Sequence, residues 1–211
     1  MLQHYGAVVG IVGGVTLLQL ANTIFAVVLP LQLALAGYSS TTAGIVTTAY
    51  GMGFLAGCVV AHRLIRSVGH IRAFAVLAAV CAVISLIFAT THIVVVWFAL
   101  RLVMGFCQAG LFTVVEGWLS AATPARARGG VLSFYLVATK IAIVGGQVVL
   151  GRADTMSLAW FDVAGAVFML ALIPVALTHT SSRQRRAWSC SVRAISGGWH
   201  RRRSWAVSAP D

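Results

Sequence analysis

The chain has 211 residues, of which 60% are hydrophobic and 9% are charged, and its mean hydropathy is +0.94. These charged residues are too few to cover the surface of a soluble domain of this size, which excludes an ordinary soluble enzyme or binding module. The net charge of +11 comes largely from arginines near the ends of apolar stretches and in the tail. This placement indicates membrane topology, and we expect no nucleic-acid partner.

Apolar stretches of about 20 residues fill most of the chain, and each has the length of a helix that crosses the hydrocarbon core of a bilayer. They predict an all-α membrane protein with a six-helix bundle over residues 1–180. The expected spans are 7–29, 42–61, 73–91, 93–114, 131–150 and 157–178.

The loops between these spans alternate in charge. The loops after spans two and four carry arginines, whereas the loops after spans one and three carry no Lys or Arg. Basic loops stay on the cytoplasmic side. We therefore expect a multi-pass protein of the cell inner or plasma membrane with both termini in the cytoplasm. The basic residues of the two loops are Arg63, Arg66, Arg72, Arg126 and Arg128.

Two cations fall deep inside predicted spans, Arg101 in span four and Lys140 in span five. Each lies roughly 12–15 Å below the outer surface, near the membrane midplane. A cation at this depth is costly unless it faces water, an acid or a ligand. The alternatives are a role in binding an anionic solute or a structural pairing with helix carbonyls or an acid.

Polar residues on other spans extend this candidate site. Gln19, Asn22 and Thr23 share one face of span one, and Gln108 and Gln147 add polar points on spans four and five. A polar stripe on a membrane helix faces other helices or a cavity. We therefore expect Gln19, Asn22, Gln108 and Gln147 to contribute to a substrate or coupling site with the two cations.

Glu116, near the cytoplasmic end of span four, is the candidate acid of an inner gate. It is placed to pair with Arg126, Arg128 or the basic residues 63–72, or it is a solvent-exposed acid at a helix end. Glycines at positions 53 and 57 have the four-residue spacing that lets membrane helices approach closely.

Motifs of enzymes and metal sites are absent from the sequence. It contains no GxSxG, HExxH or phosphate-binding loop, and the four cysteines have no metal-ligand spacing. We expect no catalytic residue, no metal and no cofactor.

Three segments together resemble the amino-terminal half of a major facilitator superfamily transporter. They are GCVVAHRLIRSVGHIRAF at 57–74, RLVMGFCQAG at 101–110, and EGWLSAATPARARGGVLSFY at 116–135. The last segment, followed by Gly146–Gln147, is similar to a bacterial branch of that family, the YcaD-like proteins. The resemblance implies half of a two-part fold, with two groups of three spans as an inverted repeat, and transport by alternating access.

The chain departs from the family pattern at several places. Arg66 stands where the family's basic loop usually has an acid, and span five lacks the Gly-Pro pair associated with antiporters. The coupling ion, with a proton as one candidate, the substrate and the direction of transport therefore stay open.

Residues 181–211 are rich in Arg, Ser and Trp and have no apolar periodicity. They predict a disordered cytoplasmic tail, a basic segment on anionic lipid, or the product of a reading-frame shift. We expect a secondary transporter of a small solute, embedded in lipid. The alternatives are a non-transporting membrane protein, an inactive fragment, or a chain that pairs with a second copy or with a missing carboxy-terminal half.

Overall fold

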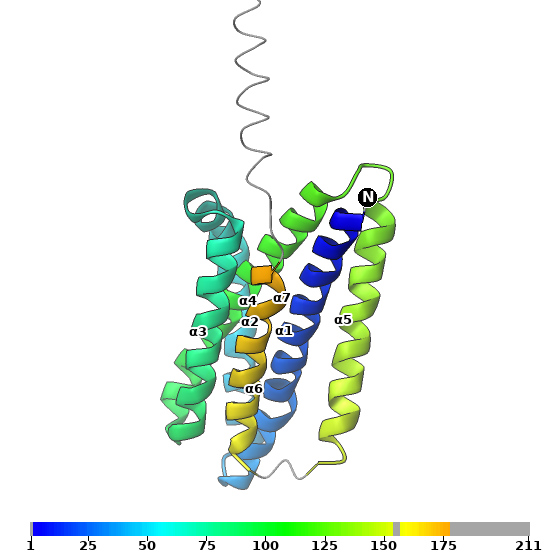
Figure 1. The fold of residues 1–211 in the computed structure, drawn as a ribbon. Helices are drawn as coiled ribbons and strands as arrows, with labels where there is room; N and C mark the ends of the chain where they lie inside the picture. The colour runs from blue at the N-terminus through cyan, green and yellow to red at the C-terminus, as the bar shows by residue number, and fades with distance from the viewer. Residues whose placement is uncertain (1, 154–156, 178–211) are drawn as a thin grey trace, which may run out of the picture. The chain divides into compact units, whose positions relative to one another are not determined.

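The computed structural model describes residues 2–153 and 157–177, and the predicted basic tail at 181–211 lies outside these residues. The described residues form seven α-helices and no strand (Figure 1). The helices are α1 (Leu2–Leu35), α2 (Ser40–Val68), α3 (His70–Thr90), α4 (Val94–Ala122), α5 (Arg128–Leu150), α6 (Ala159–Leu170) and α7 (Leu172–Leu177).

Five of these helices are long and apolar enough to cross a membrane, and a shorter apolar helix follows at Ala159–Pro174. The prediction of an all-α membrane fold is confirmed. The sixth predicted span is divided at Ala171 into α6 and α7. Pro174 has no N–H to donate to the Leu170 carbonyl, so the regular helical hydrogen-bond pattern is interrupted at this point.

Several helices extend beyond the apolar stretches that predicted them. Pro30 lies inside α1, which continues to Leu35. A proline in a helix removes one backbone hydrogen bond, and the turns on either side continue the helix here. The basic segment after span two is also helical, because Arg63 lies on α2 and Arg72 on α3.

A single residue, Gly69, joins α2 to α3 with φ 89° and ψ 156°. This positive φ favours glycine, because a side chain would be strained there. The Gly69 N–H donates to the Ile65 carbonyl at 2.9 Å and closes the last turn of α2. At the other end of α2, the Ser39 hydroxyl caps the helix by accepting from the Thr42 N–H at 3.2 Å.

The contact between α2 and α4 depends on interlocking glycines. A Cβ atom at Gly53 or at Gly105 would overlap a backbone carbonyl of the other helix. A Cβ atom at Gly57 would lie 2.6 Å from the Phe106 carbonyl oxygen. The close approach predicted from the glycines at 53 and 57 is confirmed, and Gly105 is its counterpart on α4.

An aromatic cluster joins α1, α3, α4 and α6 in the core of the bundle. The Phe25 ring centroid lies 5.2 Å from that of Phe88 and 5.1 Å from that of Phe161. The Trp97 ring lies 5.5 Å from Phe88. Rings at these separations pack favourably, and the cluster holds α1 against α4 on one side of the candidate site.

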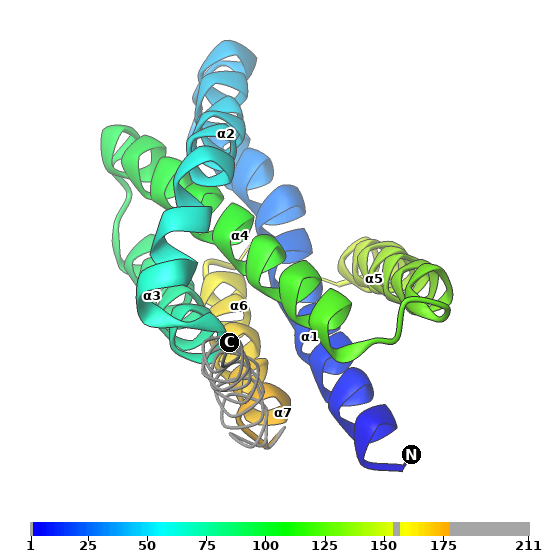
Figure 2. The ribbon, with the colours of Figure 1, turned by 90° about the horizontal axis from the view of Figure 1, so that it is seen from above.

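Helix α5 stands beside α1, apart from α2, α3 and α6 (Figure 2). Its buried residues are Tyr135, Thr139, Gly146 and Leu150. Its other faces expose long apolar side chains such as Ile141. Exposed apolar side chains also follow α2, so these two helices present surfaces suited to lipid or to another protein.

Candidate functional site

A strip of polar side chains lies between α1 and α4, which run side by side in opposite directions (Figure 1). Gln19 and Asn22 come from α1, and Arg101 and Gln108 come from α4. The antiparallel register places Gln19 beside Gln108 at one level and Phe25 beside Arg101 further along the helices. The structure thus brings together four of the six predicted substrate or coupling residues.

Gln19 and Gln108 connect the two helices directly. Gln108 Nε2 donates to Gln19 Oε1 at 3.0 Å, and both side chains are buried. The hydroxyl of Thr23, on the same face of α1, donates to the Gln19 backbone carbonyl at 2.8 Å. Thr23 therefore satisfies its own hydrogen-bonding group within α1, whereas the two glutamines bind each other across the helix interface.

Arg101 is the buried charge of this strip, with 4% of its side chain exposed. Its guanidinium carbon lies 4.9 Å from the centre of the Tyr50 ring and 5.9 Å from that of Phe25. Its Nη1 lies 3.9 Å from the Met104 sulfur. Among the described residues no carboxylate forms an ion pair with Arg101. Aromatic faces and a soft sulfur atom are its neighbours instead.

Tyr50 is a member of the site that the sequence reasoning missed. Its hydroxyl accepts a hydrogen bond from Asn22 Nδ2 at 3.4 Å while its ring covers the Arg101 guanidinium. Its ring position follows from Gly105, which allows α4 to approach the Tyr50 backbone. The glycine four residues after Arg101 is the sequence signal for a close helix contact, although it does not identify the partner residue.

Two polar atoms of the strip are buried and have no hydrogen-bond partner in the described part of the chain. They are Arg101 Nε and Gln108 Oε1. A buried donor or acceptor without a partner costs about 1–3 kcal/mol, and more for a charged group. Both residues lie on the same face of α4, so both costs fall within this strip.

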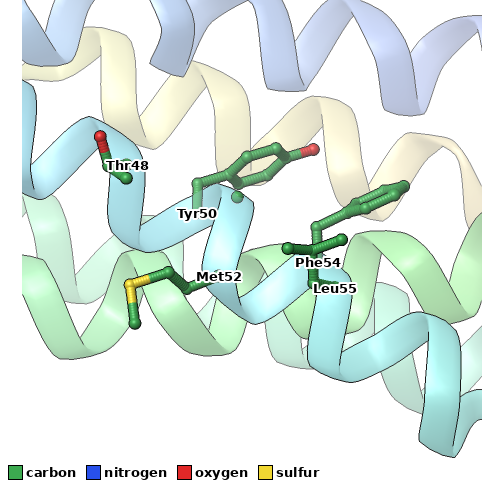
Figure 3. Close-up of a pocket in the computed structure, with 6 residues that line it drawn as sticks. Thr48, Tyr50, Met52, Phe54 and Leu55 are labelled. Carbon is green, nitrogen blue, oxygen red and sulfur yellow. The ribbon is translucent and has the colours of Figure 1, made fainter.

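A shallow groove of about 520 Å³ runs along α2 next to this strip. It is lined by Thr48, Tyr50, Gly51, Met52, Phe54 and Leu55. Figure 3 shows the Tyr50 and Phe54 rings extending to the same side of α2, away from Met52. The groove is almost entirely apolar. Tyr50 belongs to both features, since it lines the groove and contacts Arg101.

Lys140 and Gln147 do not join the strip. Both are exposed on α5, whereas the α1 side of α5 is formed by residues such as Thr139 and Gly146. A Cβ atom at Gly146 would lie 2.8 Å from Leu20. Each of the two polar residues follows such a contact residue by one position, which turns it about 100° away from α1.

The predicted gate residues gather where α2 ends and α3 begins, and where α4 ends and α5 begins. The side chains of Glu116, Arg63, Arg72, Arg126 and Arg128 are exposed, and the Arg66 side chain lies outside the described residues. No ion pair within 4.0 Å forms among those five.

At this end of the bundle Arg128 Nε donates to the Thr123 carbonyl at 3.2 Å. The described residues also include no group of three His, Cys, Asp or Glu side chains that is able to hold a metal ion.

Comparison with known proteins gives a consistent result. The sequence model of the family described as the Major Facilitator Superfamily matches residues 11–194. The relatives include the "Uncharacterized MFS-type transporter YcaD" of Escherichia coli O45:K1 (strain S88 / ExPEC), which is 26% identical over 178 residues. The protein of that name in Escherichia coli O6:K15:H31 (strain 536 / UPEC) is 25% identical over 178 residues.

Each alignment covers 82% of this chain and 46% of the relative. The chain therefore spans about half the length of the curated relatives it matches. No solved structure matches the chain. The resemblance predicted from the three sequence segments is confirmed by the family match.

Proposed function

The chain belongs to the Major Facilitator Superfamily, and on this premise we propose that it forms half of a secondary active transporter for a small solute. In this proposal one helix bundle rocks against another around a site near the membrane midplane. The proposed location is the inner membrane, with both termini in the cytoplasm. The observation that carries the proposal is Arg101, a cation with 4% of its side chain exposed and no carboxylate partner among the described residues.

Arg101 is the proposed binding group for an anionic solute. An unpaired cation inside a membrane bundle is costly, and an anion that binds it relieves that cost. The Tyr50 and Phe25 rings stabilise the guanidinium while the site is empty, because cation–π contacts are favourable but weaker than a charge-assisted hydrogen bond. Gln19, Asn22 and Gln108 supply polar contacts in the same strip. A coupling proton is a further possibility for this site.

Lys140 and Gln147 have a different proposed role. A charged side chain on the apolar face of a membrane helix favours contact with water or protein over lipid. We assign the exposed face of α5 to contact with a second six-helix unit. That unit is either a carboxy-terminal half or a second copy of this chain, and cross-linking in membranes distinguishes a specific dimer from a monomer.

The gate residues complete the proposed cycle. Glu116 and the arginines at 63, 66, 72, 126 and 128 lie at the proposed cytoplasmic end. In one state Glu116 pairs with an arginine and closes the inner side, and in the other state the pair is open. The exposure of Glu116 and of the arginines at 63, 72, 126 and 128 supports this proposal, because exposed side chains are able to exchange partners.

The principal test is uptake of labelled small carboxylates and phosphates into proteoliposomes that contain the full chain. We expect Arg101→Ala to reduce anion uptake at least tenfold, because it removes the binding charge. Arg152 provides the matched control, since it is an exposed arginine in the turn after α5, and Arg152→Ala should transport normally. Normal transport by Arg101→Ala would contradict the proposal.

A second candidate function is compatible with the alignment, which covers 46% of the relative. The alternative proposal is a non-transporting membrane protein, or an inactive fragment of a frameshifted transporter gene. This alternative predicts no solute-dependent flux by wild type or by any variant. Translating the downstream DNA in the other frames tests the frameshift, because it should reveal six further apolar spans.

A further inference from the structure

Arg101 and Gln108 each carry one buried polar atom without a partner among the described residues, and the two atoms are chemically complementary. Arg101 Nε is a donor on a cation, whereas Gln108 Oε1 is a neutral acceptor. The exposed fractions of the two side chains are 4% and 1%. A ligand that pairs with both groups needs an acceptor for Arg101 Nε and a donor for Gln108 Oε1.

Helix geometry sets the relation between the two groups. Arg101 and Gln108 are seven residues apart on α4, so they share one helix face with their Cα atoms about 10 Å apart along the axis. The neighbouring polar groups already have partners. Gln108 Nε2 donates to Gln19 Oε1, and Asn22 donates to Tyr50. The Gln108 oxygen is therefore the acceptor of this strip that has no partner among the described residues.

We infer that the solute is a bifunctional anion, with a negatively charged group for Arg101 and a hydrogen-bond donor at its other end for Gln108. Hydroxy-carboxylates and amino-carboxylates have this chemistry, and chains of about six carbons are suitable probes because the two Cα atoms lie about 10 Å apart along α4. The inference rests on the proposed function and adds the class of substrate to it. A second negative group at the far end of the solute is disfavoured, because the Gln108 oxygen only accepts hydrogen bonds and would repel an anion.

We expect this site to discriminate strongly between a ligand that has the hydrogen-bond donor and an analogue that lacks it. A site built to bind a donor strongly rejects an analogue that lacks it, because its buried acceptor then stays unpaired. We expect a six-carbon hydroxy acid to bind about tenfold more tightly than the same acid without its hydroxyl group. This preference should depend on Gln108, while the affinity for both compounds should depend on Arg101.

The test uses the full chain in lipid nanodiscs, with tryptophan fluorescence as the readout. Trp97 is buried on α4 one turn before Arg101 and reports on ligand binding there. The probes are 6-hydroxyhexanoate, hexanoate and adipate. Wild type should bind 6-hydroxyhexanoate about tenfold more tightly than hexanoate, and adipate no more tightly than hexanoate.

Gln108→Leu should reduce the preference for the hydroxy acid over hexanoate to about onefold, because the acceptor that distinguishes the two compounds is gone. Gln108→Met is the second variant, in case the leucine side chain disturbs packing, and size-exclusion profiles confirm folding. Gln147→Leu is the matched control, because Gln147 is exposed on α5, and it should keep the tenfold preference.

The outcomes separate this inference from the proposed function. If hexanoate binds in an Arg101-dependent manner but the hydroxyl group gives no advantage, the inference is wrong and the anion site remains. The inference is equally wrong if adipate binds most tightly or if both Gln108 variants keep the preference. No Arg101-dependent binding of any of the three probes would overturn both proposals.

Discussion

Arg101 on α4 and Lys140 on α5 are cations at similar depth in their helices, yet their surroundings are opposite. Arg101 is enclosed by α1, α2 and α4 and covered by two aromatic rings. Lys140 is exposed on a helix that contacts mainly α1. The difference shows that depth in a membrane helix does not define the role of a charge. The face on which it lies and the neighbours on that face decide whether it becomes a buried site or part of a contact surface.

The surroundings of Arg101 and Lys140 differ because α4 and α5 carry their contact glycines at different positions relative to the cation. Gly105 lies one turn after Arg101 and lets α2 approach so closely that Tyr50 covers the guanidinium. Gly146 on α5 brings that helix against Leu20 and Thr23 of α1, but Lys140 lies on another face. A glycine beside Arg101 therefore creates its enclosure, whereas the glycine on α5 directs Lys140 outward.

Among the variants proposed here, Gly105→Ala should have the largest effect on stability. The new Cβ atom would overlap the Tyr50 carbonyl, and backbone at a helix crossing has little room to move. We expect a loss of about 3 kcal/mol or more in the free energy of unfolding, measured by thermal denaturation in detergent. Gly145→Ala on α5 is the matched control, because a Cβ atom there meets nothing within 4 Å. Equal stability of the two variants would show that the α2–α4 contact is looser than described.

Arg101→Met should have the next largest effect, and in the opposite direction. Replacing a buried, unpaired charge by an apolar side chain of similar length removes its desolvation cost. We expect a gain of about 1–2 kcal/mol in the free energy of unfolding in the absence of ligand. Arg152→Met, in the exposed turn after α5, should change the same quantity by less than about 0.5 kcal/mol, since exposed substitutions outside the membrane segments have small effects. A destabilised Arg101→Met variant would mean that the guanidinium has partners that stabilise it strongly.

Tyr50 substitutions should have the smallest effect and should separate its ring from its hydroxyl. Tyr50→Leu removes a cation–π contact worth about 1 kcal/mol, so it should weaken anion binding several-fold through a less ordered guanidinium. Tyr50→Phe keeps the ring and loses only the 3.4 Å hydrogen bond from Asn22. It should bind the anion within about twofold of wild type. A larger loss in Tyr50→Phe than in Tyr50→Leu would assign the role to the hydroxyl group instead.

The sequence was sufficient to predict an all-helical membrane fold, because the length of an apolar segment is set by the bilayer. It did not predict where the helices end. Arg63 and Arg72 lie on helical turns that extend past the apolar stretches, and Pro30 lies within α1. Hydropathy marks the lipid-facing part of a helix, whereas its end depends on local hydrogen bonds such as those at Gly69.

The candidate site was predictable only in part, because spacing along one helix can be read from the sequence whereas contacts between helices cannot. Intramembrane charge and a three-residue polar stripe identified Arg101, Gln19 and Asn22 from one-dimensional spacing. Tyr50 comes from a different helix, and its position depends on the glycine contact of α2 with α4. Lys140 had the same one-dimensional signal as Arg101, but its orientation depends on which face of α5 meets α1. The gating role of Glu116 and the inverted repeat stay predictions.

The most direct test of the Arg101 anion site is ligand-dependent thermal unfolding of the full chain in nanodiscs, with hexanoate as the probe. A ligand that binds the folded state raises Tm as its concentration increases. We expect wild type and Lys140→Met to show the same rise in Tm with hexanoate, and Arg101→Met to show none. An equal rise in all three proteins would contradict the assignment of Arg101 as the anion-binding group.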